Sequence, residues 1–575
     1  MSSCIPKDTI KILVCSGNLG NAEPNKESIE EWIPSEGCID EVILKSQYPV
    51  DTDFVETNNF NEKKVSFNTS DNKIDIIVIG MQESTFQTQS NKKNIFDRST
   101  HNIVSPIISS TRSLRNLKKK QQKELTDKVG AKTLCGLIIS QCGDSYITLI
   151  NYERGQMRIM VLIRDTLKGN IEEVKCCAEN TGIGGVINNK GGIVASIQLC
   201  KTRISFLTAH LEAHEGEAHY RNRCSDLEEI LEGTKAKYHD ASVNSHVMFV
   251  FGDLNYRLRV TDGFDAKEGA IDKDDRFKKV HGLIKDKDWK ELNKLDELKT
   301  AVDMKDCLAG FKTLPCNFPP TFKVERGAAF VYQTKRIPSF TDRILWKCVF
   351  GMEDFVKPIL YEPIELFTTS DHKPIRGMFE VQLNESLNKV VNKSVGSLRS
   401  SIMLKKSKSL RKYDVLVSSM SCTNLPAMNK VNSSSDPYLL FVTSPKRLLQ
   451  KKGKTLFRKK QEKKDGIKSR SNGWPRGRKI NSTLNPDWED DEIRLKLQHT
   501  DDDMRGAMLF ITVFDFDHLL RLDVVIGTVV INLNAIQEKG IKSSASNNKC
   551  TISIDQPLMK FGKENGRLKC RLSLG

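Results

Sequence analysis

The chain changes character once along its length, and this change limits the folds open to it. From Lys11 to about Leu383, short apolar runs rich in β-branched residues alternate with longer, charged stretches of helical spacing. From Tyr413 onward, short strand-like runs are separated by turns, and helical stretches are few. The first pattern predicts a mixed domain of strands and helices, and the second predicts an all-β sandwich.

A stretch dominated by Ser, Asn and Lys separates the two patterns, and this composition is typical of a linker. We therefore divide the 575 residues into a first domain at 1–383, a linker at 384–411 and a second domain at 412–575. This division agrees with the roughly two to four domains that the length alone suggests.

The runs that we interpret as elements are bounded by polar residues or turns. In the first domain, the expected strands include Ile74–Ile79, Gly192–Leu199, Arg203–His210 and Val247–Asp253, and the expected helical stretches are Glu217–Lys235 and Phe277–Leu298. In the second domain, the expected strands are Tyr413–Met420, Pro437–Val442, Glu492–Leu497, Met508–Phe514, Val524–Leu533 and Arg567–Leu574.

Much of the positive charge is concentrated in one segment. The whole chain has a formal net charge of +16, and residues 445–479 contain 15 Lys or Arg against two acids. The segment lies between two expected strands, so we interpret it as a basic loop insertion in the second domain. Such a block is typical of a solvated, disordered loop; the functional alternatives are an anionic membrane surface or a nucleic acid as partner.

The cysteines and the absence of long apolar runs bear on localisation. The 15 cysteines show no pairing or metal-binding spacing, and the N-terminus lacks the apolar segment of a secretory signal. These features predict reduced thiols and a cytoplasmic location. No apolar run approaches the roughly 18–20 residues that a membrane span requires, so membrane association is expected to be peripheral.

Polar residues able to do chemistry follow the expected strands of the first domain. The strand Val247–Asp253 leads into Asn255, and side chains two residues apart on an extended chain point to the same face. Other strand ends and apolar runs bring further candidates, which are Asn18, Glu83, His210, Asp371 and His372. One such end is equally typical of an ordinary turn, but five together indicate an active site.

These side chains suit a metal-assisted phosphate hydrolase. The oxygens of Asn18 and Glu83 are ligands that Mg²⁺ prefers, and such an ion stabilises charge on a phosphoryl oxygen and on a leaving alkoxide. His210 and His372 are suited to contact the phosphate or the attacking water. Asp253 is suited to orient or deprotonate that water.

Two longer motifs resemble one known family. The segments Phe251–Arg257 (FGDLNYR) and Pro338–Leu345 (PSFTDRIL) are together similar to the paired signature of the inositol polyphosphate 5-phosphatases. Further similar segments follow in order between Lys11 and about Glu380, namely GMQE at 80–83, NKGG at 189–192, AHL at 209–211, RN at 221–222, FPPTFK at 318–323 and SDHKP at 370–374. The resemblance implies a deoxyribonuclease I-like fold, an α+β four-layer sandwich of the endonuclease/exonuclease/phosphatase type with two packed mixed β-sheets flanked by helices.

The resemblance also implies roles for single residues. It implies a Mg²⁺ site at Asn18 and Glu83, and catalytic roles for His210, Asp253, Asn255, Asp342, Asp371 and His372, of which His372 pairs with Asp342. The implied substrate-binding residues are Asn189, Lys190, Arg257, Lys323, Lys335, Arg336, Arg343 and Lys373. Among these, Lys323, Lys335 and Arg336 resemble the groups that grip the neighbouring 4-phosphate. A structural salt bridge is the alternative for Arg343, and a tight glycine turn for residues 189–192.

Three positions depart from the family pattern. Ser16-Gly17 replaces the usual Thr-Trp before Asn18, Phe251 stands where Trp is common, and Phe322 replaces a Tyr before Lys323. The missing Tyr hydroxyl is a potential contact to the 4-phosphate, so the choice of ring phosphate is the least determined property. No catalytic group is lost, and we expect an active enzyme.

The second domain resembles a C2 domain in three loop segments. Segments 425–438 and 514–523 are similar to its first and third calcium loops, and 481–488 to an intervening turn. The resemblance implies a Ca²⁺ site built from Asp436, Asp515, Asp517 and Asp523. Asn429 stands where an Asp is usual, so a weak site and a C2 domain that needs no Ca²⁺ both stay open, as do solvated turn acids.

The resemblance as a whole implies a Mg²⁺-dependent phosphoinositide 5-phosphatase that a C2 domain recruits to anionic membranes. The expected substrates are phosphatidylinositol 4,5-bisphosphate and 3,4,5-trisphosphate, with soluble inositol polyphosphates in addition. The alternatives are a nuclease of the same fold and a catalytically inactive membrane-binding scaffold. The segments at 318–323 and 335–339 match the inositide branch, so nucleic acid is not the expected partner.

Overall fold

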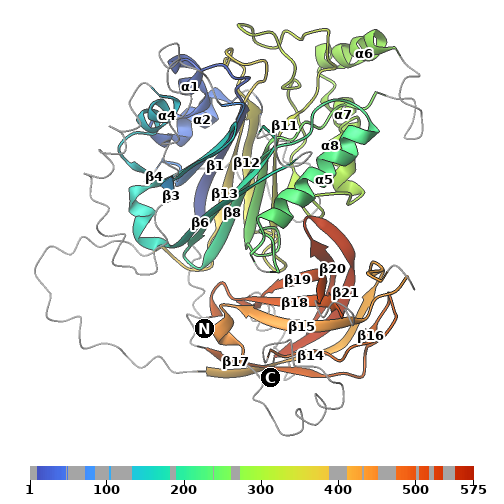
Figure 1. The fold of residues 1–575 in the computed structure, drawn as a ribbon. Helices are drawn as coiled ribbons and strands as arrows, with labels where there is room; N and C mark the ends of the chain where they lie inside the picture. The colour runs from blue at the N-terminus through green and yellow to red at the C-terminus, as the bar shows by residue number, and fades with distance from the viewer. Residues whose placement is uncertain are drawn as a thin grey trace, which may run out of the picture. The chain divides into compact units, whose positions relative to one another are not determined.

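The computed structural model describes residues 9–46, 48, 72–84, 103–104, 133–181, 189–236, 238–260, 272–387, 411–429, 433–450, 474–499, 504–516, 523–534 and 551–574. These residues form two compact units (Figure 1). The first unit draws on Met1–Thr234, Val247–Lys347 and Asp354–Asn388, and the second on Lys235–His246, Cys348–Glu353 and Lys389–Gly575.

The first unit contains a seven-stranded mixed sheet in the order β12-β13-β1-β2-β5-β4-β3. Its strands are β1 (Thr9–Asn18), β2 (Ile76–Gln82), β3 (Ile103–Val104), β4 (Tyr146–Arg154), β5 (Met157–Arg164), β12 (Val356–Pro363) and β13 (Ile375–Gln382). The central strands β1 and β2 run parallel, and β13 pairs antiparallel with β1. Because β1 and β2 are parallel and in register, Asn18 and Gln82 end the two strands side by side.

A second sheet of six strands has the order β10-β11-β9-β8-β7-β6. Its strands are β6 (Ile171–Asn180), β7 (Gly191–Leu199), β8 (Thr202–His210), β9 (Val247–Asp253), β10 (Lys312–Thr313) and β11 (Asp342–Cys348). Strands β8 and β9 are parallel, with His210 opposite Asp253 at their carboxyl ends. The parallel pairing therefore places the two expected catalytic residues at the same edge.

The two sheets approach closely where glycine allows it. A Cβ atom at Gly80 of β2 would lie 2.3 Å from the Thr208 hydroxyl of β8 and 2.5 Å from the Phe251 ring of β9. No side chain fits at this position, so the strand ends that carry Glu83, His210 and Asp253 are held near one another.

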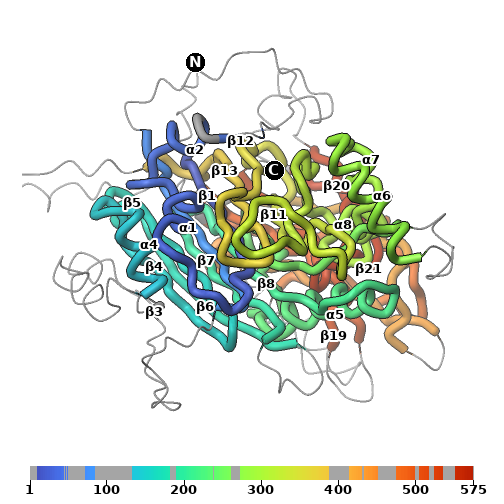
Figure 2. The backbone as a smooth tube through the Cα atoms, turned by 90° about the horizontal axis from the view of Figure 1, so that it is seen from above, coloured from blue at the N-terminus to red at the C-terminus, as the bar shows by residue number. Residues whose placement is uncertain are grey.

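Helices cover the outer faces of the two sheets (Figures 1 and 2). The helices α1 (Lys26–Trp32), α2 (Ile39–Lys45) and α4 (Leu134–Cys142) share an apolar core with β1 and β2 that includes Trp32 and Ile138. Helix α5 (Glu217–Gly233) lies on the second sheet, where a Cβ at Gly192 of β7 would meet Ile230 at 2.8 Å. Short 3-10 helices are η1 (Ser35–Gly37), η4 (Asp165–Asn170) and η6 (Lys446–Leu448). Two mixed sheets flanked by helices confirm the expected fold class.

The helical stretch expected at Phe277–Leu298 is three short helices instead of one. They are α6 (Lys273–Lys285), α7 (Trp289–Lys294) and α8 (Glu297–Asp303). The side chains of Asp288 and Asp296 accept backbone N–H groups at the start of α7 and α8. An aspartate that caps the next helix competes with continuation of the previous one, which periodicity alone does not reveal.

The second unit is strand-rich, as expected, with the order β15-β18-β19-β20-β21-β14-β16 and β17 paired to β14. Its strands are β14 (Arg411–Thr423), β15 (Pro437–Ser444), β16 (Asp487–Trp488), β17 (Ile493–His499), β18 (Met508–Asp515), β19 (Val524–Asn532), β20 (Thr551–Lys560) and β21 (Lys563–Leu574). A buried apolar cluster that includes the fully buried Trp488 forms the core. The sequence pattern did not predict β20, and β16 lies in the segment 481–488 that resembled a turn.

The two units do not divide the chain at a single point. Two short segments, 235–246 and 348–353, belong to the second unit although their sequence neighbours belong to the first. Within the second unit, the Asp240 carboxylate accepts the Phe561 N–H at 3.1 Å, and the Phe350 carbonyl accepts the Asn532 N–H at 3.1 Å. No pattern in the sequence indicates this arrangement, because the contacts join positions that are far apart in the chain.

Some of the expectations lie on residues outside the described ones. These are Asp517, most of the 384–411 linker and most of the basic insertion at 445–479. Among the described helices, none is long and apolar enough to cross a bilayer.

Candidate active site

The end of strand β9 supplies the centre of the site. Gly252 has φ +141°, and a Cβ there would lie 2.0 Å from the Ala209 carbonyl oxygen, so only glycine fits beside β8. After Asp253 the chain turns, with Leu254 N–H donating to the Thr341 carbonyl at 2.8 Å. Asn255 then adopts a left-handed conformation (φ 57°), which asparagine tolerates better than most residues.

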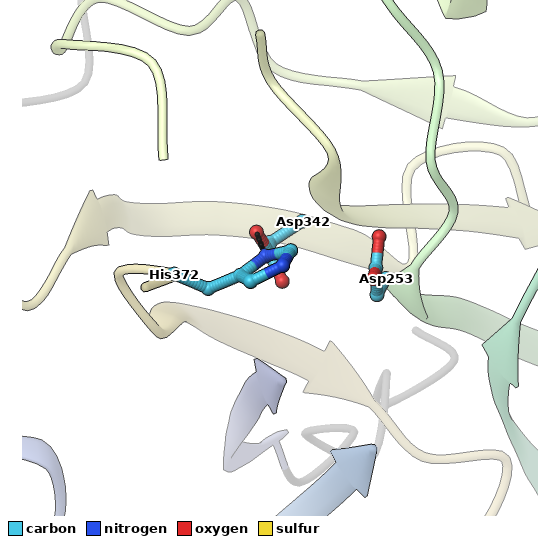
Figure 3. A group of neighbouring side chains, drawn as sticks. All are labelled: Asp253, Asp342 and His372. Atoms are coloured by element: carbon cyan, nitrogen blue, oxygen red, sulfur yellow. Dashed lines mark hydrogen bonds and ion pairs between the residues drawn. The ribbon is translucent and has the colours of Figure 1, made fainter. Parts of the chain in front are cut away.

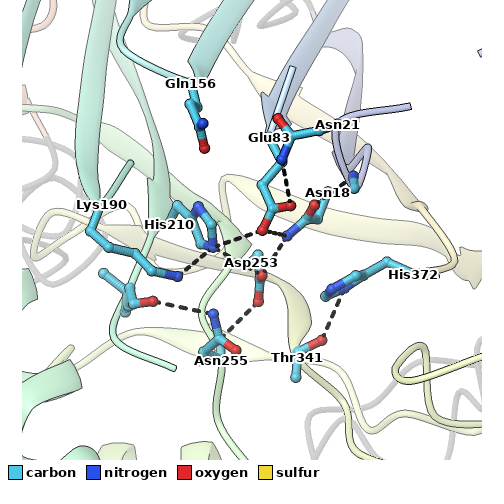
Figure 4. Close-up of polar contacts among 12 residues, drawn as sticks. Asn18, Asn21, Glu83, Gln156, Lys190, His210, Asp253, Asn255, Thr341 and His372 are labelled. Atoms are coloured by element: carbon cyan, nitrogen blue, oxygen red, sulfur yellow. Dashed lines mark hydrogen bonds and ion pairs between the residues drawn. The ribbon is translucent and has the colours of Figure 1, made fainter. Parts of the chain in front are cut away.

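Asp253 is buried and held by two neighbours (Figure 4). Its Oδ2 accepts a hydrogen bond from Asn18 Nδ2 at 2.9 Å and lies 3.3 Å from His210 Nε2. Burial by itself raises the pKa of this carboxyl. The charges of His372 and Lys190 and the hydrogen bond from His210 reverse that effect and lower the pKa below its usual range. Asp253 is therefore an ionised carboxylate at neutral pH.

Asn255 is fixed on both sides of its amide. Its Nδ2 donates to the Leu211 carbonyl at 3.2 Å, and its Oδ1 accepts from Arg257 Nη2 at 2.5 Å. Arg257 also donates through Nε to the Asn255 carbonyl at 3.0 Å, and its guanidinium lies over the Phe322 ring, 4.8 Å from the centroid. These contacts give Arg257 the role of orienting Asn255 from within the protein.

Glu83 and Asn18 provide an oxygen-rich group at the ends of β1 and β2 (Figure 4). The Glu83 carboxylate accepts hydrogen bonds from Asn18 and Asn21, each at 3.2 Å, and is 30% exposed. Within the described part of the chain, no Lys or Arg nitrogen lies within 4.0 Å of it. An anionic oxygen with amide neighbours, open to solvent and lacking a cationic partner, fits a hard ion such as Mg²⁺.

His372 and Asp342 form a buried couple (Figure 3). The Nδ1 atom of His372 lies 3.0 Å from Asp342 Oδ2, which also accepts the hydroxyls of Thr321 (2.8 Å) and Thr341 (3.0 Å). Burial lowers the pKa of His372, but Asp342 and Asp253 raise it to about 9. The ring is therefore an imidazolium at neutral pH.

The atoms of Asp253, Asp342 and His372 lie close enough for a metal site, within 4.8 Å of one another, and this is the only such group among the described residues. The His372 nitrogen that faces Asp342 is taken by a hydrogen bond. We therefore interpret the group as a charge-paired couple beside the Asp253 carboxylate.

Lys190 adds an ammonium to the site. Its Nζ lies 2.6 Å from His210 Nε2, and burial lowers its pKa against the opposing effect of Asp253 and Glu83. Asn189 precedes it in a half-buried turn. A Cβ at the following Gly191 would lie 2.2 Å from the Glu179 carbonyl oxygen. Residues 189–192 therefore form a tight glycine turn, and this turn also places Lys190 beside His210.

A second cationic group surrounds Asp371. Lys323 Nζ lies 2.9 Å from Asp371 Oδ2, and Arg326 Nη2 lies 3.5 Å from Oδ1. Burial raises the pKa of Asp371, but His372, Lys323 and Arg326 lower it below its ordinary value. Asp371, for which the resemblance implies a catalytic role, here pairs with Lys323 and Arg326. The sequence pattern did not indicate a role for Arg326.

Arg326 also joins two other loops. Its Nη2 donates to the Gly20 carbonyl at 2.8 Å, and its Nη1 donates to the Thr369 carbonyl at 3.3 Å. It thereby connects the loop after β1 with the loop that carries Asp371. Arg326 directly follows Glu325 and had no sequence signal, because nothing in the pattern shows which loops its side chain contacts.

Lys335 is exposed and Arg336 is half-buried. Neither side chain forms an ion pair with any residue that the structure describes. Binding of an anionic ligand by Lys335 and Arg336 stays a prediction.

Two other expected phosphate-binding residues have partners inside the protein. All three N–H groups of Lys373 donate to carbonyls, those of Ala328 (2.7 Å), Glu365 (2.8 Å) and Phe367 (2.9 Å). Arg343 is buried and pairs with Asp296 at 2.5 Å. These contacts argue against phosphate binding by either residue, because no donor of Lys373 is left over and Arg343 is closed off. The Arg343–Asp296 contact is the kind of salt bridge that was the alternative for Arg343.

A buried charge network below the site also escaped the sequence analysis. Glu297 Oε2 accepts Arg223 Nη2 at 2.6 Å and the Arg257 N–H at 2.9 Å. It thereby fixes the backbone of the residue that orients Asn255. A charged residue on a helix is read from sequence as solvated, so the pattern of α8 did not reveal its burial.

In the second unit, Asp436, Asp515 and Asp523 lie at the ends of β15, β18 and β19. None of them belongs to a group of three potential ligands within 4.8 Å in the described part of the chain. The expected Ca²⁺ set is therefore not assembled by these three residues.

The fold and the site define a member of a hydrolase superfamily. Residues 15–378, well over half of the chain, match the model of endonuclease/exonuclease/phosphatase family 2, and the chain belongs to this family. Residues 467–547 match the model of the C2 domain.

Three of the curated relatives that match the chain are named as 5-phosphatases. The chain is 27% identical over 249 residues to type I inositol polyphosphate 5-phosphatase 2 of Arabidopsis thaliana, covering 41% of this chain and 35% of the relative. It is 30% identical over 252 residues to type II inositol 1,4,5-trisphosphate 5-phosphatase of Mus musculus, covering 42% and 23%. It is 28% identical over 273 residues to phosphatidylinositol 3,4,5-trisphosphate 5-phosphatase 2A of Danio rerio, covering 45% and 20%. The matches thus span only a fifth to about a third of the relatives' own lengths.

A solved structure of the inositol polyphosphate 5-phosphatase domain of a synaptojanin, in complex with inositol (1,4)-bisphosphate and calcium ion, is also similar. The identity is 22% and the TM-score 0.44, with 65% of this chain and 85% of that chain covered.

Proposed function

We propose that this chain is a Mg²⁺-dependent phosphoinositide 5-phosphatase that works as a peripheral protein on cytoplasmic membrane surfaces. Its substrates are phosphatidylinositol 4,5-bisphosphate and 3,4,5-trisphosphate, with soluble inositol polyphosphates in addition. The observation that carries the proposal is the buried Asp253 carboxylate, which is kept ionised beside His210, His372 and Lys190. The names of the relatives support the choice of the 5-phosphate.

Glu83 and Asn18 are the residues that would hold Mg²⁺. When bound, such an ion neutralises charge on a phosphoryl oxygen and favours departure of the alkoxide. The Glu83 carboxylate is suited to this task because amides orient it and, among the described residues, no Lys or Arg pairs with it.

Asp253 is the group that orients and deprotonates water. Its lowered pKa keeps it a carboxylate over the physiological range, so it accepts hydrogen bonds from the attacking water. A carboxylate with a lowered pKa is a weak proton acceptor, so orienting the water is its main task. Asn255 and His210 hold the phosphate beside it. The His372 imidazolium places a positive charge opposite the growing negative charge, and Asp342 keeps that proton in place.

Recognition of the ring phosphates falls to cations at the rim. Lys323, Lys335 and Arg336 suit a vicinal phosphate, since a dianion is best bound by several positive groups. The Phe322 ring packs against the His372 ring at a tilt of 38°, with 4.5 Å between the centroids. It offers an apolar wall, where a tyrosine would also offer a hydroxyl, so we expect the 4-phosphate to depend on these cations alone.

The deciding assay measures phosphate release from short-chain phosphatidylinositol 4,5-bisphosphate with Mg²⁺ and with a chelator, alongside nicking of plasmid DNA. We expect Mg²⁺-dependent release without nicking. Asp253→Ala should abolish release and leave liposome binding unchanged, and the exposed Asp490→Ala should change neither. Nicking without lipid hydrolysis would establish the nuclease instead. Liposome binding without either activity would establish an inactive scaffold.

A further inference from the structure

One ring nitrogen of His210 has no partner among the residues that the structure describes. The His210 side chain is buried, and its Nε2 lies 2.6 Å from Lys190 Nζ and 3.3 Å from Asp253 Oδ2. The other ring nitrogen, Nδ1, is buried without a hydrogen bond to any described residue. Buried polar atoms without a partner are rare in folded proteins, so a partner for Nδ1 is expected.

The partner of this atom has to be able both to donate and to accept. A neutral ring that donates from Nε2 to the Asp253 carboxylate has a lone pair on Nδ1. A ring whose Nε2 accepts from the Lys190 ammonium has its proton on Nδ1 instead. A carboxamide serves both states of the ring, because its NH₂ group donates and its oxygen accepts.

Gln156 presents a carboxamide to His210. It lies in the two-residue turn between β4 and β5, where Arg154 pairs with Met157 and Gly155 has φ 57°. Figure 4 shows the half-buried Gln156 side chain pointing toward the His210 ring. Its amide forms no hydrogen bond with any other residue in the described part of the chain, so the amide is available to the ring.

The backbone holds Gln156 at this place. Its carbonyl accepts both the N–H group of Ser84, at 3.0 Å, and the Ser84 hydroxyl, at 3.2 Å. Ser84 follows Glu83, whose backbone is left-handed (φ 48°) and whose carbonyl accepts the Asn21 N–H at 2.9 Å. The turn is thus tied to the segment of the expected Mg²⁺ ligand. A change of the Gln156 side chain leaves these backbone contacts in place.

Gln82 is the competing amide. It is fully buried, its Nε2 donates to the Thr208 hydroxyl at 3.0 Å, and its Oε1 has no partner among the described residues. Thr208 lies two residues before His210 on β8, so both side chains point to the same face of the sheet. The hydrogen bond to Thr208 holds the Gln82 amide at that residue, whereas the Gln156 amide points at the ring itself (Figure 4).

We propose that Gln156 is a positioning residue for His210, whose carboxamide pairs with Nδ1 and thereby keeps Nε2 directed at the reacting phosphate. Partly exposed side chains change rotamer within picoseconds to nanoseconds, which lets the amide close on the ring. The role in turnover rests on the proposed function, in which His210 holds the phosphate. The contact itself involves neither substrate nor metal ion.

The first test measures that contact by NMR in EDTA near neutral pH. The full chain contains 10 histidines, which are labelled with ¹⁵N in the ring, and the His210 signals are assigned by their loss in His210→Asn. Gln156→Met removes both hydrogen-bonding groups at nearly the same side-chain length, so the Nδ1 resonance should shift. Gln156→Glu keeps only acceptors, so the resonance should move toward that of a protonated nitrogen. An unchanged Nδ1 resonance in both variants would overturn the proposal.

Two further variants show where any shift originates. Gln382→Met makes the same exchange at the far end of the sheet, where Gln382 pairs with Thr9 at the start of β1, and it should leave the resonance unchanged. An equal shift in this control would overturn the proposal, because the effect of Gln156→Met would then not be local. A shift in Gln82→Met without one in Gln156→Met would assign the contact to Gln82 and overturn it as well.

The second test is kinetic and depends on the proposed function. With short-chain phosphatidylinositol 4,5-bisphosphate, Gln156→Met should lower kcat by about 5- to 10-fold, as expected for one hydrogen bond, and leave KM within about twofold. An unchanged kcat in an active enzyme would overturn the positioning role. A wild type without phosphatase activity would contradict the proposed function instead, and the ring spectra would then decide whether Gln156 pairs with His210.

Discussion

At the scale of single residues, the site works through pairs of groups that change each other's ionisation. Asp253 stays ionised although it is buried, because His372 and Lys190 are close to it. His372 stays protonated although it is buried, because Asp342 and Asp253 are close to it. Each group is thus in its useful state only because the other is present, and a change at one position should be visible as a titration shift at another.

The first prediction concerns the alkaline limb of the pH profile. The pKa of His372 is raised to about 9, so the imidazolium is complete below that value and is lost as the pH rises through it. We expect kcat/KM to fall above about pH 9. Asp342→Asn removes the strongest of the charges that raise this pKa, and should move the limb to lower pH by about one unit or more. A limb at the same pH in wild type and variant would show that His372 does not control it.

The second prediction concerns Arg326, which joins the loop at Gly20 with the loop of Thr369 and Asp371. Arg326→Gln removes these contacts at a partly exposed site, so we expect a fall in kcat/KM of about 5- to 10-fold with a stable fold. Steady-state kinetics on a soluble lipid measure it. Arg478→Gln, which breaks one exposed ion pair with Asp491 in the second unit, serves as the control. Equal kinetics in both variants would remove Arg326 from the site.

At the scale of elements, parallel pairing decides where chemistry gathers. The carboxyl ends of β1 and β2 lie together, as do those of β8 and β9. The residues just beyond those ends, among them Glu83 and Asn255, then share one edge. A glycine at each close approach, Gly80 and Gly252, allows the strands to meet there.

The third prediction tests that requirement. In Gly252→Ala the new Cβ would lie 2.0 Å from a carbonyl oxygen, at a φ that disfavours alanine. We expect a loss of about 2 kcal/mol or more in the free energy of unfolding and loss of activity, because Asp253 follows directly. Urea denaturation measures the first effect. Gly282→Ala, in α6 with nothing within 4 Å of the new Cβ, is the control and should stabilise by about 0.5–1 kcal/mol. Equal stability of the two variants would refute the steric argument.

At the scale of the whole molecule, the chain builds two compact units from interleaved segments. The segment 235–246 lies in the sequence between α5 and β9, yet it completes the second unit. Asp240 is the residue that ties it in, because its carboxylate accepts both the Ser242 N–H (2.7 Å) and the Phe561 N–H (3.1 Å). The second unit therefore includes residues that precede the linker in the sequence as well as those that follow it.

The fourth prediction follows from those two hydrogen bonds. Asp240→Ala leaves two N–H groups without an acceptor in a buried place, so we expect a loss of about 2–4 kcal/mol in the stability of the second unit. Hydrogen exchange of the Phe561 amide should accelerate accordingly. Asp490→Ala, an exposed position of the same unit, should leave that exchange unchanged. Unchanged exchange in Asp240→Ala would show that the contact carries no stability.

The sequence by itself determined some of the strands, the change to an all-β second half and the strand ends at which Asn18, Glu83, His210 and Asp253 stand. These properties are local: strand propensity, alternation and ordered motifs are written in neighbouring residues. Expectations that depended on one residue's partner were less secure. Lys373 was expected to bind phosphate, and Arg343 either to bind phosphate or to form a structural salt bridge. In the structure, their donors meet carbonyls and Asp296.

Only the tertiary structure decided which charged side chains are paired within the protein and which are left for a ligand. A lysine has the same sequence signature whether it meets substrate, as proposed for Lys323, or three carbonyls, as for Lys373. It likewise decided that Arg326 contacts Asp371 and that Glu297 accepts the Arg257 N–H. It also places Lys479 beside Asp436. Ionisation and pairing are set by groups within a few ångströms, and folding brings those groups from distant parts of the chain.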